Sequence, residues 1–449
     1  MEDLVSAVRD AGVVGAGGAG FPTHVKLGGG CESVLVNGAE CEPLLEVDQQ
    51  LMALYPSRVL EALDAVVRSL GAREGIIGIK DKYREALEAL GGEIGGFPSL
   101  RLHVLPNVYP AGDEQVLVYE ATGRIVPEGG IPLEVGVVVL NVETLLNIWG
   151  AMRGIPVTEK YLTVCGEVHR PATVRVPLGV SFGEVIAAVG GSPLKDFVVI
   201  DGGPMMGRVV RRMDEPVTKT TKGLIVLPPD HPLVVAKERD MRSMMSLAKT
   251  ACCHCMLCTD LCPRYLLGHR LRPDKLMRLA AYNDTCEGDA AATEAFLCCE
   301  CGMCEVACVM GLQPWKLNRE LKSRMGRMGI RNPHREAPKE VNPFRSFRGF
   351  PTPKLLGRLG LSRYGGVHAP MGEVEVQPRR LVLKLKQHIG APSVPVVAPG
   401  KRVARGELLA RLGGNVSANL HAPLGGLVES VGEDLLVLRV SDDLGGVEA

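Results

Sequence analysis

The chain has 449 residues, which is too long for one hydrophobic core and predicts two to four domains. Hydrophobic residues make up 46% and charged residues 23%, as in globular proteins, and the 51 basic residues balance the 51 acidic ones. This balance argues against a general electrostatic attraction to nucleic acid. No apolar run is long enough to cross a bilayer, so we expect no transmembrane segment.

The N-terminal region contains a glycine loop with an ambiguous motif. The first twelve residues predict a short helix, which either packs on its own domain or targets the chain to an assembly. Gly15, Gly17 and Gly20 then satisfy the letters of GxGxxG, but a dinucleotide fold needs a strand before them and a helix after them. A helical pattern precedes the loop and Pro22 follows it. We therefore expect a nest of backbone N–H groups for phosphate, with a plain tight turn as the alternative.

Up to residue 157 the sequence alternates buried strands with helices, which predicts an α/β domain with a largely parallel sheet. Apolar runs that read as strands cover residues 33–40, 74–80, 100–106 and 135–143, and helical patterns cover residues 51–71 and 82–92. A smaller α+β module follows over residues 158–235, where short strands and Pro/Gly turns enclose one helix.

The rest of the chain divides by composition. Residues 240–330 combine cysteines with helical segments. Residues 331–377 form a basic, Pro- and Gly-interrupted linker, and the stretch 316–363 has 13 Lys/Arg against 3 Asp/Glu. We expect it to run exposed over the surface, with a docking patch for an acidic partner as the alternative. Residues 378–440 read as short strands at close spacing, an all-β module.

Most of the 14 cysteines fall between residues 252 and 308, as expected for a metal site rather than a disulfide scaffold. Two runs, CCHCMLCTDLCP and CCECGMCEVACV, repeat the spacing C-x2-C-x2-C-x3-C. In two-cluster ferredoxins this spacing binds [4Fe–4S] clusters, and the fourth cysteine of each run ligates the other cluster. The sequence therefore predicts one cluster on Cys252, Cys255, Cys258 and Cys308, and another on Cys262, Cys298, Cys301 and Cys304.

Three cysteines of this region fall outside that pattern. Cys253 and Cys299 are out of register by one residue and are predicted to be bystanders, and Cys286 lies alone between the two runs.

Four ordered segments carry a family resemblance. GAGGAGFPTHVK resembles the flavin-mononucleotide (FMN) loop of the flavoprotein subunit of respiratory complex I, and VNGAECEP, VYPAGDEQVLV and VLNVETLLNI resemble later segments of that family. The resemblance implies FMN as cofactor and NADH as substrate. Ala16, Ala39 and Leu140 depart from the family pattern, because they replace an Arg, an Asp and an Asn.

The same resemblance assigns the cofactor-binding residues. Those implied around the flavin phosphate are Gly15, Gly17, Gly18 and Lys26. Those implied along the isoalloxazine ring and ribityl chain are Asn37, Glu40, Gly112, Asp113 and Asn141. Those implied to face the nicotinamide nucleotide are Phe21, Glu42 and Glu114, and the matching segments add Tyr109 and Thr144. We expect no acid–base side chain to be decisive, because the redox cofactors carry the chemistry.

The order of the parts narrows the resemblance. The module after the flavin domain resembles a soluble-ligand-binding β-grasp (SLBB) domain, which either binds a ligand or, as we favour, only packs. The β module resembles barrel-sandwich lipoyl and biotinyl carriers, but GGNVSANLHAP lacks the carrier lysine, which leaves a structural or docking role. Because this module comes last rather than first, the chain resembles the cobalamin reductases of propanediol-utilisation microcompartments more than the RnfC component of Rnf complexes.

We therefore predict a multidomain α/β oxidoreductase that passes electrons from NADH through FMN and two [4Fe–4S] clusters to cob(III)alamin or cob(II)alamin. The resemblance implies a cytoplasmic location, within a bacterial microcompartment in the relatives. It also implies partners among cobalamin, cobalamin-carrying enzymes, and shell or redox proteins. Two alternatives stay open: an Rnf-type component that exchanges electrons between NADH and ferredoxin, and an electron-transfer adaptor without flavin.

Overall fold

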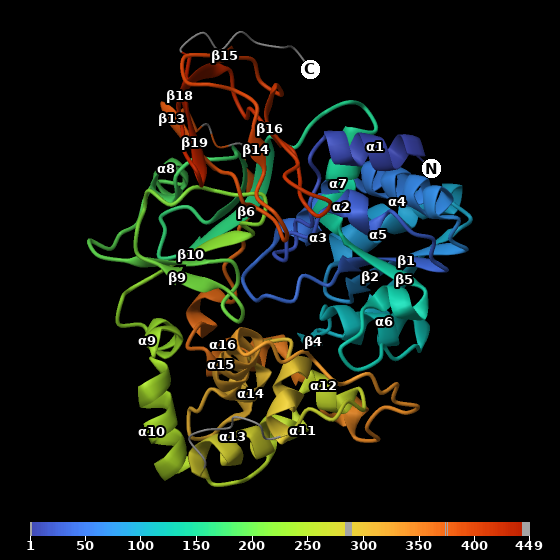
Figure 1. The fold of residues 1–449 in the computed structure, drawn as a ribbon, viewed down its shortest axis with the longest axis vertical. Coiled ribbons are helices and arrows are strands. Elements are labelled where there is room, and N and C mark those ends of the chain that lie inside the picture. The colour runs from blue at the N-terminus through green and yellow to red at the C-terminus, as the bar shows by residue number, and fades with distance from the viewer. Residues whose placement is uncertain (1, 283–289, 373, 375, 442–449) are drawn as a thin grey trace.

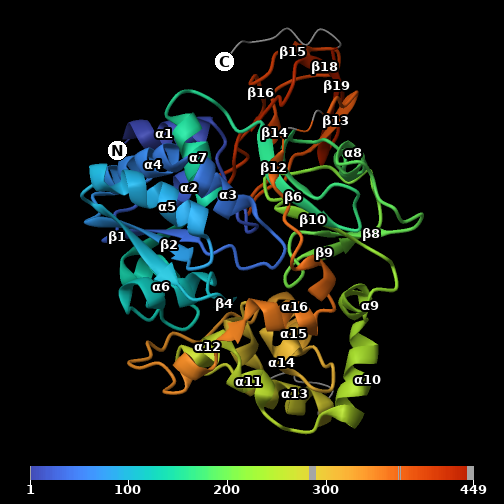
Figure 2. The same cartoon turned by 180° about the vertical axis from the view of Figure 1, so that it is seen from behind.

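A computed structural model describes residues 2–282, 290–372, 374 and 376–441. The N-terminal α/β domain and the β-grasp module lie side by side, with the cysteine-bearing helices below them and the last β module above (Figure 1). The same arrangement is seen from behind in Figure 2. No helix in the described ranges is long and apolar enough to cross a membrane.

The α/β domain is built on a four-stranded parallel sheet in the order β3-β2-β1-β5. Its strands read as continuous apolar runs because helices cover both faces of the sheet. The strands lie where the sequence predicts them: β1 Ser33–Gly38, β2 Glu74–Lys80, β3 Leu100–Leu105 and β5 Val137–Asn141. The helices are α1 Glu2–Asp10, α2 Thr23–Lys26, α3 Val47–Leu54, α4 Pro56–Leu70, α5 Arg84–Glu93, α6 Glu114–Thr122 and α7 Val142–Ala151, with short 3-10 turns η1 Ile94–Gly96 and η2 Pro132–Val135.

One predicted helix is wrong in detail. The pattern over residues 51–71 is divided between α3 and α4, because the chain leaves helical geometry at Tyr55 (φ −130°). The residue before a proline avoids helical geometry, whereas Pro56 itself suits the first turn of the next helix. Gly71, in the left-handed conformation, ends α4.

The start of the chain does not form the strand–loop–helix unit of a dinucleotide fold. Helix α1 packs against α2 and α7 of its own domain, with Val8 fully buried. The glycine loop connects α1 to the single turn α2, and an isolated bridge between Val14 and Pro22 closes it. This context differs from that of a GxGxxG fingerprint, as expected, and the phosphate nest stays a prediction.

The β-grasp module is a six-stranded mixed sheet, in the order β12-β7-β6-β10-β8-β9, with one helix packed on it. Its elements are β6 Glu159–Gly166, β7 Ala172–Pro177, α8 Phe182–Ala188, β8 Val198–Asp201, β9 Arg208–Val210 and β10 Gly223–Leu227. Helix α9, Pro232–Glu238, leads from it to the cysteine-bearing helices.

The cysteine-bearing part is helical and has its own hydrophobic core. Its elements are α10 Met241–Ala251, α11 Leu257–Asp260, α12 Pro263–Leu266, α13 Pro273–Tyr282, η3 Ala290–Leu297, α14 Met303–Ala307 and α15 Pro314–Arg327. Cys286 lies outside the described residues.

Residues 331–372, which we call the strap, tie the other parts together. The strap adds β11 to β4 of the α/β domain and β12 to the edge strand β7 of the β-grasp sheet. Segments that read as a linker therefore become ordered by strand pairing, a contact that composition does not reveal. The elements concerned are β4 Val108–Tyr109, η4 Arg345–Phe347, β11 Phe350–Pro351, α16 Thr352–Arg358, η5 Ser362–Tyr364 and β12 Met371–Gly372.

The last module consists of two small sheets, in the orders β13-β19-β18-β15 and β14-β16-β17. Its strands are β13 Arg380–Lys384, β14 Val394–Pro395, β15 Arg402–Val403, β16 Leu408–Arg411, β17 Leu420–His421, β18 Gly426–Val431 and β19 Leu435–Val440. Its apolar side chains join the core cluster of the α/β domain and the β-grasp module. We propose the boundaries 1–157, 158–235, 240–330, 331–377 and 378–440 as the working division of the chain.

Candidate functional site

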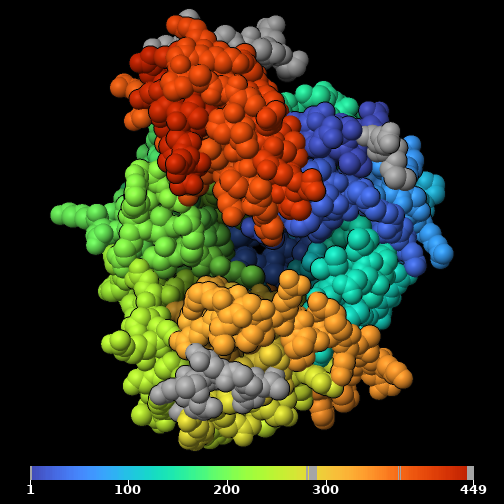
Figure 3. Space-filling view, viewed as in Figure 1, coloured from blue at the N-terminus to red at the C-terminus, as the bar shows by residue number. Residues whose placement is uncertain are grey.

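An elongated recess lies at the carboxyl ends of β1 and β5, where open α/β sheets bind ligands. It consists of two hollows of about 160 and 200 Å³, which share Gly17, Asn37 and Asn141. We call them the loop hollow and the inner hollow. The molecular surface is hollowed where the blue, green and orange segments of the chain meet (Figure 3).

The glycine loop and Lys26 form the loop hollow. The Gly15 N–H donates to the Phe21 carbonyl at 2.9 Å, which closes the loop. Ala16 is buried, and its N–H donates to Thr144 Oγ1 at 3.0 Å, so no side chain projects from that position into the hollow. Lys26 Nζ lies 3.1 Å from Glu114 Oε1 and 2.8 Å from the Val139 carbonyl, so a cation stands at the loop.

The loop is held from outside by the last β module and the β-grasp module. The Ile389 N–H donates to the Gly20 carbonyl at 3.1 Å. Gly20 has a positive φ, and a Cβ there would come within 2.8 Å of Thr220 Cγ2 and 3.2 Å of His388 Cα. Glycine is therefore required at Gly20 for both its conformation and its close packing.

Glu40 and the first turn of α3 form one wall of the inner hollow. The backbone of Glu40 is left-handed, with φ +38°, a strained conformation for a residue with a side chain. Its carboxylate accepts hydrogen bonds from the backbone N–H groups of Asp48 (2.9 Å) and Gln49 (3.2 Å). Burial, with the neighbouring charge of Asp48, raises the pKa of Glu40 to about 7.

A buried charge network backs the same wall. Lys222 Nζ lies 2.6 Å from Asp48 Oδ1 and 3.3 Å from Glu143 Oε2, and Lys160 Nζ lies 2.5 Å from Glu143 Oε2. Asp48 also accepts a hydrogen bond from Asn141 Nδ2 at 2.8 Å. Burial lowers the pKa of Lys160 to about 8. The two lysines come from the β-grasp module, whereas the carboxylates come from the α/β domain.

Glu42 fixes a β-grasp loop over the inner hollow. Its two carboxylate oxygens accept hydrogen bonds from the backbone N–H groups of Met205 and Met206, each at 2.8 Å. Burial raises the pKa of Glu42. A Cβ at Gly203 would fall 2.1 Å from Glu42 Oε2, so the loop approaches the carboxylate as closely as glycine allows. The implied role of Glu42 toward nicotinamide stays a prediction.

The inner hollow also borders the cysteine-bearing helices, because Cys299 and Cys301 line it. The Tyr109 hydroxyl donates to the Cys301 carbonyl at 2.5 Å. Arg264, two residues after Cys262, forms a bidentate pair with Asp113 at 2.5 and 3.0 Å. Burial alone would raise the Asp113 pKa, but Arg264 outweighs it and holds that pKa below its ordinary value.

The two cysteine runs adopt the same backbone conformation. His254 and Glu300 stand at equivalent places in the runs, with φ of +55° and +59°. Met256 and Gly302 are likewise equivalent, with φ of +64° and +76°, and a short helix follows each. The internal repeat in the sequence is therefore also a structural repeat.

The predicted ligands gather as two quartets. Cys252, Cys255, Cys258 and Cys308 all line one small cavity of about 30 Å³. In the other quartet, burial raises the pKa of Cys304, and the adjacent thiols of Cys298 and Cys262, followed by Cys258, raise it further. The pKa of Cys301 is raised first by its hydrogen bond with Cys299 and by burial, and then by the neighbouring thiols, among them Cys262 and Cys304. These thiol sets fit [4Fe–4S] clusters in ligand number and chemistry.

The quartets differ from single-ion sites and from each other. Within the described ranges, no group of three or more His, Cys, Asp or Glu side chains could hold one metal ion. A cubane instead spreads its ligands over four separate irons. Cys255 is exposed, whereas Cys262, Cys301 and Cys304 are buried, and Cys301 lines the inner hollow, so the second quartet is the one that borders the recess.

The recess contains thirteen of the fourteen cofactor-binding residues implied by the resemblance; Gly18 is exposed on the loop and lines neither hollow. Sequence reasoning missed further lining residues of the inner hollow, namely Cys41, Leu45, Asp48, Pro110, Met206, Lys222 and Cys299. Cys41 lies between two implied residues and could have been found from that position. Lys222 belongs to another module and no sequence signal pointed to it.

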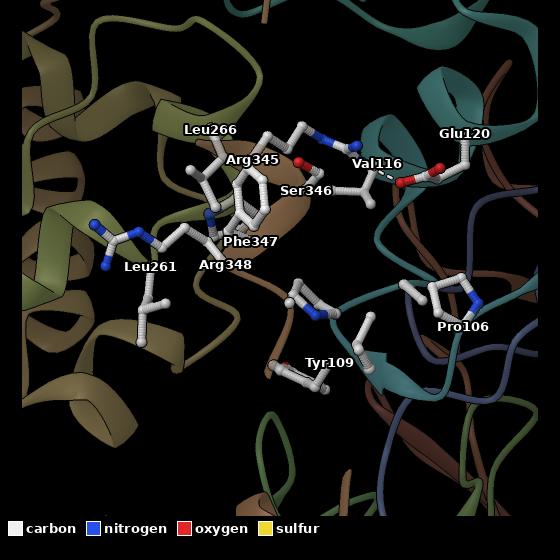
Figure 4. Close-up of a pocket in the computed structure, with 15 residues that line it drawn as sticks. Pro106, Tyr109, Val116, Glu120, Leu261, Leu266, Arg345, Ser346, Phe347 and Arg348 are labelled. Atoms are coloured by element: carbon white, nitrogen blue, oxygen red, sulfur yellow. Dashed lines mark hydrogen bonds and ion pairs between the residues drawn. The ribbon is translucent and has the colours of Figure 1, made fainter. Parts of the chain in front are cut away.

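A separate cavity of about 410 Å³ lies behind Tyr109 and Pro110, which line both it and the inner hollow. The strap forms one side of it: Phe347 lines the cavity together with Leu261 and Tyr109, and Arg345 reaches across to Glu120 at 2.5 Å (Figure 4). This ion pair joins the strap to the α/β domain across a cavity whose lining is mostly apolar.

Comparison with protein-family models gives four matches in chain order. The Nuo51 FMN-binding domain matches residues 8–150 and the SLBB domain matches residues 161–209. The 4Fe-4S dicluster domain matches residues 251–313, and the RnfC barrel sandwich hybrid domain matches residues 367–441. These matches confirm the predicted multidomain class and both predicted kinds of cofactor domain.

Sequence comparison with individual proteins identifies the family of the chain. The chain is 45% identical to the cobalamin reductase PduS of Salmonella typhimurium, over 97% of this chain and 96% of that one. It is 44% identical to PduS of Citrobacter freundii, over 96% and 95%. The chain belongs to the PduS family.

More distant similarities extend beyond the PduS family. A component of the Na(+)-translocating ferredoxin:NAD(+) oxidoreductase complex of Acetobacterium woodii is 39% identical over 58% of this chain and 57% of its own. An NAD+-reducing [NiFe]-hydrogenase structure covers 74% of this chain and 63% of its own, with 22% identity and a TM-score of 0.46. As a member of the PduS family, the chain is a flavin/iron–sulfur oxidoreductase homologue.

Proposed function

We propose that the chain reduces cobalamin with electrons from NADH, as the name of the PduS relatives suggests for those proteins. NADH gives up two electrons together as hydride, whereas cob(III)alamin takes one electron at a time. The protein therefore needs to divide an electron pair. FMN in the recess, together with two [4Fe–4S] clusters, would supply that ability, since a flavin accepts hydride and releases single electrons.

One observation carries this proposal: Cys301, a member of the second cysteine quartet, lines the recess, and its neighbour Cys299 lines it too. In the proposed complex, the loop N–H groups and Lys26 bind the flavin phosphate, and Asn37 and Asn141 contact the body of the flavin. The Tyr109 and Arg264 contacts fix the cysteine-bearing helices against the recess. A fixed separation between the cofactors is what electron transfer requires of the protein.

The test is an anaerobic assay of NADH oxidation with cob(III)alamin, ferredoxin and a quinone offered as competing acceptors. Preferential cobalamin reduction is expected. Preference for ferredoxin would instead favour the Rnf-type alternative, which the partial identity to the Acetobacterium woodii protein supports. Protein that retains iron but binds no flavin after incubation with FMN would overturn the proposal in favour of the adaptor.

We further propose a cytoplasmic location within a microcompartment, with cobalamin-carrying enzymes, shell proteins or redox proteins as partners. The resemblance supports this proposal. Cell fractionation that places the chain with purified microcompartments is the expected result, and its recovery in other fractions alone would contradict it.

A further inference from the structure

Lys222 is the candidate, because it is a charged β-grasp residue in the wall of a recess formed mainly by the α/β domain and the cysteine-bearing helices. The strand β10, which pairs with β6, begins directly after Lys222. The side chain of Lys222 contacts Asp48 of α3 and Glu143 of α7. Only 7% of Lys222 is exposed, and its side chain lines the inner hollow. A buried ammonium facing a cavity is costly unless charge within reach stabilises it.

The partners of Lys222 hold its ammonium in a fixed place. Asp48 (2.6 Å) and Glu143 (3.3 Å) both contact Nζ. Burial works against its charge, but these two carboxylates outweigh burial and hold the Lys222 pKa above its ordinary value. Asp48 is itself fixed by Asn141 and by Glu40, which accepts the Asp48 N–H. The lysine therefore remains a permanent cation at this wall.

The position of Lys222 along the recess indicates what it faces. The loop N–H groups and Lys26 mark the loop hollow as the place for the dianionic phosphate. The recess continues past Gly17, Asn37 and Asn141 into the inner hollow, where the other end of an extended ligand must lie. For FMN, which is the assignment of the proposed function on which this inference rests, that end is the ring.

We propose that Lys222 tunes the redox potential of the flavin by stabilising the negative charge that the ring gains on reduction. When hydride leaves the nicotinamide, its C–H bond breaks and an N–H bond forms on the ring, which takes up two electrons and one proton. The oxidised nicotinamide departs as a cation, and the ring retains one negative charge. A fixed ammonium in the wall of the hollow favours this reduced form over the oxidised one.

The experiment measures the midpoint potential of bound FMN by anaerobic dithionite titration of the full chain, with the flavin-free protein as the blank for cluster absorbance. In Lys222→Met, the binding preference for reduced over oxidised FMN is expected to fall about tenfold. This fall corresponds to a midpoint potential lower by about 30 mV. Lys222→Arg keeps the charge and is expected to keep the potential near that of the wild type.

Two further variants separate redox tuning from structural support. Lys160→Met disrupts the same network at Glu143, but Lys160 lines neither hollow, so the potential should move much less than in Lys222→Met. Asp48→Asn removes a carboxylate beside Lys222 and should raise the potential. A merely structural role would not produce shifts of opposite sign. If Lys222→Met does not fold, Asp48→Asn still decides the matter.

The proposal is overturned if Lys222→Met or Asp48→Asn binds FMN with an unchanged potential, or if Lys160→Met shifts it as much as Lys222→Met does. The titration uses neither NADH nor cobalamin. A failed cobalamin assay alongside the expected shifts would therefore reject the proposed reaction and retain the role of Lys222.

Discussion

Lys26 shows how a single side chain can serve both the closed loop and a bound phosphate. Its ammonium is paired with Glu114 at 3.1 Å, and both side chains are partly exposed. A phosphate at the loop would offer the lysine a stronger, doubly charged partner. Exchanging Glu114 for a phosphate costs little free energy, because an exposed ion pair contributes little to stability by itself.

Lys26→Met should therefore weaken FMN binding. A hydrogen bond to a charged group contributes about 1.5–3 kcal/mol, so the expected loss in affinity is roughly ten- to a hundredfold. The flavin-to-protein ratio after dialysis against defined FMN measures it. Lys195→Met, a substitution at an exposed lysine away from the recess, is the control. An unchanged ratio in Lys26→Met would reject the assignment of the loop hollow to phosphate.

At the scale of elements, the two cysteine runs share one backbone conformation. Both runs turn through left-handed residues before a short helix, so equivalent cysteines point to equivalent places. Cys253 is exposed at the cavity of the first quartet, and Cys299 faces the inner hollow. The division into ligands and bystanders rests on spacing and stays a prediction, because each predicted bystander lines the same hollow as a predicted ligand.

The iron content of cysteine variants tests the quartets. Cys258→Ser and Cys304→Ser should each lose about half of the iron, because each removes one ligand of a different cluster. Cys253→Ser and Cys299→Ser should keep the wild-type content, measured by anaerobic iron and sulfide analysis. An equal loss in a bystander variant and its ligand neighbour would contradict the assignment.

The strands and their parallel direction were predictable, because a strand buried on both faces must be apolar throughout. The break at Tyr55 was missed, although Pro56 signalled it. The pairing of the strap with β4 and β7 left no trace in composition. In the same way, Lys222 could not be assigned to the recess, because its place depends on how two modules pack.

At the scale of the whole molecule, Lys219 joins three modules, and among the described residues no carboxylate forms an ion pair with it. Its ammonium donates to the carbonyls of Gly12 and Asn419, each at 2.7 Å, so it links the α/β domain, the β-grasp module and the last β module. Burial lowers its pKa to about 7. The folded state therefore binds this proton more weakly than the unfolded chain does.

This junction should make stability depend on pH. Between about pH 7 and the ordinary lysine value near 10.4, the unfolded chain binds more protons than the folded one, so stability rises with pH in that window. The contribution is at most about 1.4 kcal/mol per pH unit. Lys219→Met should flatten the rise in Tm between pH 7 and 10 relative to wild type. Parallel Tm profiles for the two proteins would contradict this account.

The contact between Gly20 and Ile389 also bears on the order in which the protein matures. The glycine loop leaves the ribosome early, yet the chain that closes over it is translated hundreds of residues later. The cysteine runs lie between the two, so their metal can enter while the loop is still open. Stable flavin loading should accordingly follow the synthesis of the last β module, and retained FMN should mark molecules whose synthesis is already complete.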